Sequence, residues 1–142
     1  MEDTYTIPYG RNSYCGPAAL AYVTRTDPDT AAAHLRRWGR LRAVKGVSND
    51  LLQFTMRQLG IQFHFCMPTQ LRWNSKRGKW IKPTLSCWMD AVPDGEYIVN
   101  ITGHYIVVHN DLVFDNRFHL GKSVCVCPYL RRRVKAAWRI ER

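Results

Sequence analysis

The chain has 142 residues, of which 46% are hydrophobic and 23% charged, and its net charge is +10. Its length and hydrophobic content suit one domain that buries its core without disulfides or metal ions. No stretch approaches the roughly 20 apolar residues that span a membrane, and the first residues lack the basic and apolar regions of a secretory signal. We therefore expect a single domain over residues 1–142, located in the cytoplasm and without a membrane partner.

Three helices are predicted in the first part of the chain. Residues 15–23 combine small alanines, which allow close packing, with larger apolar residues that point inward. A second helix begins at Pro28, with Asp27 as its cap, and ends near Gly39. A third covers residues 49–59, with a serine before it, an apolar stripe along it and a glycine after it.

The middle of the chain is less regular. Residues 61–66 are predicted to form a strand, and residues 68–83 a basic, mobile loop. A short helix with one apolar face is expected at 84–91, and the Pro-Asp-Gly sequence at 93–95 marks a turn.

From residue 97 the apolar period changes to two, which is typical of strands. We expect antiparallel strands at 97–101, 104–109, 112–115 and 134–140. Two-residue turns at 102–103 and 110–111 would join the first three. Helices followed by an antiparallel sheet predict the α+β class.

The chain contains five cysteines, an odd number without a secretory signal, which predicts free thiols rather than a disulfide framework. Cys125 and Cys127 would share one face of a strand. The companion spacing of a zinc site is missing, however, so we expect neither a metal nor a cofactor.

Basic residues gather at 36–42, 72–82 and 131–133. Such a charge is compatible with an acidic protein or a nucleic acid as partner, and also with a solvated basic face. It says nothing about the fold, and the sequence leaves the oligomeric state open.

Cys15 stands at the start of the first predicted helix, in the stretch NSYCGPAAL at residues 12–20. The positive end of a helix dipole favours a thiolate, and the unpaired backbone N–H groups of the first turn can receive an oxyanion. Gly16 would let a substrate carbonyl approach closely, and Pro17 starts the helix without losing a hydrogen bond. Together these features predict a nucleophilic cysteine.

A cysteine nucleophile needs a base and a residue that orients the base. His104 begins a predicted strand, and a two-residue turn at 110–111 would make it a diagonal neighbour of Asp115 on one face of the hairpin. A three-residue turn would instead bring Asn116 to that face, so Asn116 is the reserve for the orienting role. The histidines at 34, 64, 109 and 119 are expected to be structural or on the surface.

Each of these three residues also has a purely structural explanation. Cys15 would be a core residue, His104 a hydrogen-bonded strand residue, and Asp115 a turn residue at a strand end. Only their combination points to chemistry.

NSYCGPAAL, GHYIVV at 103–108 and Asp115-Asn116 resemble the papain-like cysteine peptidases, most closely the C39-like peptidase group and its small bacteriophage-encoded members. The resemblance implies a papain-like fold, in which a helix carrying the cysteine docks against an antiparallel sheet. It also implies Cys15 as nucleophile, His104 as base and Asp115 as the orienting residue, acting on a peptide or protein substrate. For a phage-encoded chain, the expected location is the host cytoplasm or the virion.

One departure from the family concerns the oxyanion hole, where a glutamine usually stands six residues before the cysteine. That position is Tyr9 here, and Asn12 offers an amide at a different offset. Losing one oxyanion donor typically costs two to three orders of magnitude in rate. The sequence nevertheless favours a cysteine hydrolase, in particular a peptidase that works through a thioester on Cys15. The alternatives are another thioester-forming enzyme such as a deubiquitinase, amidase or acyl transferase, a catalytically inactive module that binds an acidic protein or nucleic acid, and an ordinary basic α+β protein.

Overall fold

The computed structural model describes residues 15–40, 46–66, 72–116, 121–123 and 127–142. Within these ranges it has mixed helices and antiparallel strands, which confirms the predicted α+β class. The helices are α1 (Cys15–Thr24), α2 (Pro28–Gly39), α3 (Asn49–Gln58) and α4 (Leu85–Ala91). The strands are β1 (Phe63–Phe65), β2 (Arg72–Asn74), β3 (Lys79–Ile81), β4 (Glu96–Ile101), β5 (His104–His109), β6 (Leu112–Phe114), β7 (Lys122–Ser123) and β8 (Val134–Ile140). None of these helices has the length and apolar character needed to cross a membrane.

Side-chain caps fix where α2, α3 and α4 begin, and the caps of α2 and α3 are those predicted from the sequence. The Asp27 carboxylate accepts a hydrogen bond from the Thr30 backbone N–H at 2.8 Å, in front of α2. The Ser48 hydroxyl accepts from the Leu51 N–H at 3.1 Å, in front of α3. Thr84 caps α4 in the same way. Each cap satisfies a backbone donor that has no partner within the helix.

The main sheet has the strand order β1-β8-β4-β5-β6-β7, and every neighbouring pair is antiparallel. The turn at Thr102 and Gly103 has a positive φ at both residues (45° and 81°), as a tight two-residue hairpin requires. The second hairpin pairs His109 with Leu112, which confirms the predicted two-residue turn between them. β7 is not predicted from the sequence, because two residues are too few to show an alternating pattern.

The predicted loop at 68–83 is wrong where the structure describes it, because residues 72–81 form the β2–β3 hairpin. Residues 67–71 lie outside the described ranges. Trp73 pairs with Trp80 across the two strands, and the Asn74 side chain accepts a hydrogen bond from the Arg77 N–H at 3.0 Å in the connecting turn. Gly78 closes that turn with a φ of 62°. The many basic residues obscured a hairpin that this turn and the aromatic pair stabilise.

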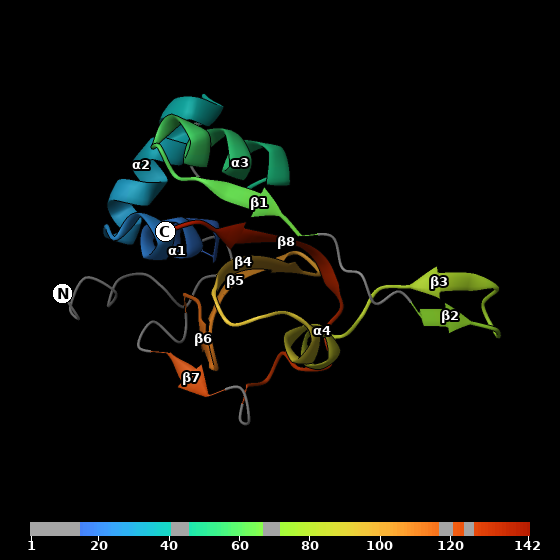
Figure 1. Ribbon diagram of the computed structural model, residues 1–142. Coiled ribbons are helices and arrows are strands. Elements are labelled where there is room, and N and C mark those ends of the chain that lie inside the picture. Colours follow the sequence, from blue (N-terminus) through green and yellow to red (C-terminus); the bar gives the residue numbers. More distant parts are fainter. Residues whose placement is uncertain (1–14, 41–45, 67–71, 117–120, 124–126) are drawn as a thin grey trace.

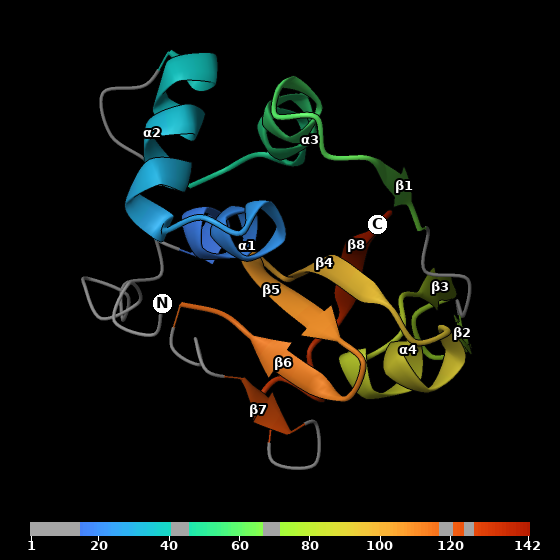
Figure 2. The same ribbon diagram turned by 60° about the vertical axis from the view of Figure 1, so that its left-hand side comes forward.

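The sheet is covered on both faces (Figure 2). Helices α1, α2 and α3 cover one face, packing against Ile98, Val107 and Trp138. Helix α4 and Tyr129 cover the other face, where Val99 and Ile106 are among the buried strand residues. Alternate residues of β4, β5 and β8 therefore enter two separate hydrophobic clusters, as the period of two requires.

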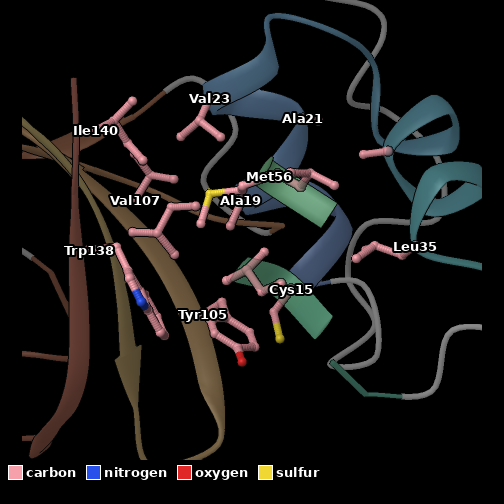
Figure 3. Close-up of a cluster of buried hydrophobic side chains, with 14 of the residues drawn as sticks. Cys15, Ala19, Ala21, Val23, Leu35, Met56, Tyr105, Val107, Trp138 and Ile140 are labelled. Carbon is pink, nitrogen blue, oxygen red and sulfur yellow. The ribbon is translucent and has the colours of Figure 1, made fainter. Parts of the chain in front are cut away.

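Helix α1 lies deepest of the helices, between the sheet and α2 (Figures 2 and 3). Ala19, Leu20 and Ala21 are at most 1% exposed, and the small side chains of the two alanines allow neighbouring elements to approach closely. Its first residue, Cys15, belongs to the same cluster (Figure 3). The packing of α1 thus fixes the position of the cysteine relative to β5.

The other end of α1 is held by ionic contacts. Glu96, buried at the start of β4, accepts hydrogen bonds from Arg25, just after α1, and from Arg142. Arg142 also donates to the carbonyl of Val23 at 2.7 Å. A buried carboxylate is stable only when paired, so these contacts keep the end of α1 on the sheet.

Candidate functional site

Cys15 is the first residue of α1, as the sequence predicts, and it is 8% exposed. We expected Gly16 to leave room for a substrate, but the space beside its Cα is occupied by Val47. A Cβ at residue 16 would lie 2.5 Å from the Val47 Cγ2. Glycine is therefore needed here for the close approach of Val47 to the start of α1, which holds the cysteine in place.

His104 and Asp115 are brought together at the other side of the site. The His104 Nε2 lies 2.8 Å from the Asp115 Oδ2, and the two side chains are 9% and 0% exposed. The ladder between β5 and β6 ends at Val107 and Phe114, and Asp115 follows directly outside the strand. Of the two candidates for orienting the imidazole, Asp115 is therefore the one that contacts it. Asn116 is the next residue along the chain and is also buried.

The environment of His104 favours the imidazolium. Burial lowers the pKa of His104, but side-chain hydrogen bonds to Asp115 and Cys15 and the charges of both outweigh burial and raise the pKa to about 9. His104 is therefore protonated at neutral pH and paired with the Asp115 carboxylate. Since Nε2 is bound to Asp115, Nδ1 is the ring nitrogen left to interact with Cys15.

Tyr129 is a member of the site that sequence reasoning missed. Its hydroxyl donates a hydrogen bond to the Asp115 Oδ2 at 2.7 Å, the same oxygen that contacts His104. Its ring packs against the imidazole with the ring centroids 5.2 Å apart. Tyr129 thus holds both members of the pair, yet it lies in a turn before β8, where no sequence pattern connects it to them.

Tyr105 fixes the segment beside Cys15. Its hydroxyl lies 2.8 Å from the Val47 carbonyl and 2.7 Å from the Asn49 Oδ1, and Asn100 donates to the same Asn49 oxygen at 2.9 Å. Burial raises the pKa of the Tyr105 hydroxyl, and the charge of the neighbouring Cys15 raises it further (Figure 3). The segment that packs on Gly16 is therefore tied to β4 and β5.

The remaining candidates fall outside this cluster. Asn12, Tyr9, His119 and Cys125 lie outside the described residues, so the predicted oxyanion donor is not placed. His109 contacts the Tyr22 hydroxyl at 2.6 Å, His64 pairs with Glu141 on the surface, and His34 is half-buried in α2. Cys15, Cys66, Cys87 and Cys127 are free thiols. Over the described ranges, no group of three or more His, Cys, Asp or Glu side chains is arranged to bind a metal ion.

A cavity of about 260 Å³ lies at the opposite end of β5 from His104. It is lined by residues of α4, the turn at 92–95, β4 and the end of β5, including Met89, Tyr97 and Val108. None of Cys15, His104 and Asp115 lines it. This cavity is therefore separate from the Cys15–His104–Asp115 cluster.

No protein-family model matches the chain, and no curated protein is significantly similar to it in sequence.

Proposed function

We propose that the protein is a cysteine hydrolase of the papain-like fold, and specifically a peptidase. In this proposal Cys15 is the nucleophile, His104 the base and Asp115 the residue that orients the imidazole. The observation that carries the proposal is the buried His104–Asp115 pair, whose imidazole interacts with a cysteine at the first position of a helix. A buried ion pair is costly to keep in a core and is typical of a site with a chemical role.

The reaction would begin from a Cys15 thiolate next to the His104 imidazolium. The sulfur attacks the carbonyl carbon of an amide, and the carbonyl electrons move to the oxygen, which the backbone N–H groups at the start of α1 would stabilise. When the carbonyl re-forms, the C–N bond breaks and the imidazolium gives its proton to the leaving amine. The product of this half-reaction is a thioester on Cys15 and a free amine.

Water would complete the cycle. Neutral His104 takes a proton from water as the oxygen attacks the thioester carbon, and the C–S bond breaks to release a carboxylic acid and the Cys15 thiolate. Asp115, supported by Tyr129, keeps the imidazole in place throughout both steps. An acyl transferase would share the first half-reaction and replace water with another acceptor, so these residues define the reaction class more narrowly than the substrate.

The interaction between Cys15 and His104 can be tested by alkylation of each cysteine with iodoacetamide over a range of pH, followed by mass spectrometry. We expect Cys15 to react fastest near neutral pH, ahead of the exposed Cys87, because Cys15 has an imidazolium partner. His104→Ala should remove this advantage. His109→Ala is the matched control, since His109 lies at the other end of β5 and should leave Cys15 unchanged.

A peptide-hydrolysis assay then tests whether a reactive Cys15 also catalyses cleavage. Cys15→Ala should abolish cleavage of a peptide library while the protein stays folded by circular dichroism. Cleavage that survives in this variant, or a native Cys15 no more reactive than Cys87, would overturn the proposed function.

A further inference from the structure

The β2–β3 hairpin is an arm that projects from the body of the molecule (Figure 1). It forms its own two-stranded sheet and takes no part in the main sheet. Its downstream end is anchored to β8, because Val134 donates to the Pro83 carbonyl at 2.9 Å and Arg133 donates to the Lys82 carbonyl at 3.0 Å. These bonds hold the base of the arm against the folded body.

Two tryptophans lie exposed on one face of this arm. Trp73 and Trp80 are directly opposite each other across the strands, and they are 51% and 60% exposed. Their ring centroids are 5.5 Å apart in a T-shaped arrangement. The pair stabilises the hairpin, but half of the surface of each side chain remains in water, where a large apolar group gains nothing. Such an exposed aromatic pair is typical of a binding surface.

The same arm is strongly basic. Residues 72–82 include five lysines and arginines and no acidic residue, which is half of the net charge of +10 in 11 residues. Lys76 and Arg77 occupy the turn at the tip, and both are exposed. The ligand that fits this surface therefore combines negative charge with flat, stackable groups.

We infer that the β2–β3 hairpin binds single-stranded nucleic acid. Unpaired bases stack on aromatic side chains without regard to sequence, and phosphates are attracted to the surrounding lysines and arginines. A duplex hides the faces of its bases, so it would engage the cations but not Trp73 and Trp80. A membrane-inserting hairpin would carry its apolar residues at the tip, where this arm instead has Lys76 and Arg77.

The inference goes beyond the proposed hydrolase and is independent of it, because none of the hairpin residues belongs to the Cys15 site. It can be tested with the full chain and a fluorescein-labelled oligo(dT) of about 20 nucleotides, long enough for several stacked bases. Binding is measured by fluorescence anisotropy over a series of NaCl concentrations. Trp73→Ala with Trp80→Ala should weaken binding about tenfold or more, because two stacking platforms are lost.

Two further variants separate stacking from charge. Trp73→Phe with Trp80→Phe should restore most of the affinity, which also shows that the loss in the alanine variant is not caused by an altered fold. Affinity falls as salt rises, and Lys76→Ser with Arg77→Ser should make the slope of log affinity against log salt less steep by about 1.4, since two phosphate contacts are removed. Arg37→Ser with Arg57→Ser, in α2 and α3 on the other side of the molecule, removes the same charge and should change binding less (Figure 1).

Cys15→Ala should bind oligo(dT) as the native chain does. A result that refutes the hydrolase proposal can therefore be distinguished from a result that refutes the nucleic-acid site. Equal binding of a duplex of the same length, with no effect of the tryptophan substitutions, would overturn the inference in favour of nonspecific attraction. Stronger binding to vesicles containing phosphatidylglycerol, or to polyglutamate, would overturn it in favour of a membrane or an acidic protein.

Discussion

Replacing Asp115 by asparagine should change how the stability of the protein depends on pH. His104 has a pKa of about 9 in the folded chain and 6.5 as its ordinary value. A group whose pKa is raised by folding stabilises the fold below its unfolded pKa, and this contribution disappears as the pH rises through the folded pKa. Each pKa unit corresponds to about 1.4 kcal/mol, so His104 should contribute about 3 kcal/mol at pH 6 and almost nothing at pH 10.

Asp115→Asn replaces the carboxylate whose hydrogen bond is the largest of the influences that raise the pKa of His104, and it also removes the Asp115 charge. Burial then lowers the pKa of His104, so the variant should lose at least half of the pH dependence between pH 6 and pH 10. The assay is urea unfolding at a series of pH values, with the pKa of His104 followed by NMR. Cys15→Ala, measured in parallel, reports how much of the pH dependence of stability comes from the interaction of His104 with Cys15.

Titrating groups outside the Cys15–His104–Asp115 cluster are common to all these proteins, so their contributions to the pH dependence cancel when the variants are compared. If the native chain and Asp115→Asn lose stability in parallel over this range, the ion pair does not have the strength assigned to it. The same conclusion follows if NMR shows that the pKa of His104 stays at its ordinary value in the native chain.

Two further substitutions test the packing of the site. Tyr129→Phe keeps the ring on His104 but removes the hydrogen bond to Asp115, and it should lower the free energy of unfolding by about 2 kcal/mol in urea denaturation; an unchanged value would mean that the bond contributes nothing. Gly16→Ala should destabilise the protein by about 2 kcal/mol, because its Cβ would overlap Val47. In a double-mutant cycle, Val47→Ala should recover about 1 kcal/mol of that loss, whereas strictly additive effects would show that the two residues do not compete for space.

Much of the fold follows from local signals in the sequence. The caps at Asp27 and Ser48 predict two helices and the period of two after residue 97 predicts the central strands, because hydrogen bonds and burial within a few residues decide them. The β2–β3 hairpin was missed because its strands are short and exposed, so no alternation between buried and polar residues marks them. β7 was missed because it has only two residues.

The candidate site likewise has contacts that the sequence predicts and contacts that it does not. The proximity of His104 and Asp115 could be predicted because one hairpin register links them. Tyr129 could not, because it reaches Asp115 from a separate turn through tertiary packing alone. The reason for Gly16 also differs from expectation, since its partner Val47 lies in a segment that no short-range pattern brings to the start of α1.

The position of β8 between β1 and β4 makes the order of synthesis matter. During translation α1, α2, α3 and β1 are made first and the β4–β5–β6 meander follows, but β1 joins the sheet only when β8 pairs with both neighbours. Trp138 of β8 is also fully buried against α1 and its cluster. A nascent chain that stops before residue 134 therefore lacks the strand that joins β1 to the rest of the sheet, and we infer that Cys15 and His104 reach their final arrangement only after nearly all of these 142 residues have been made.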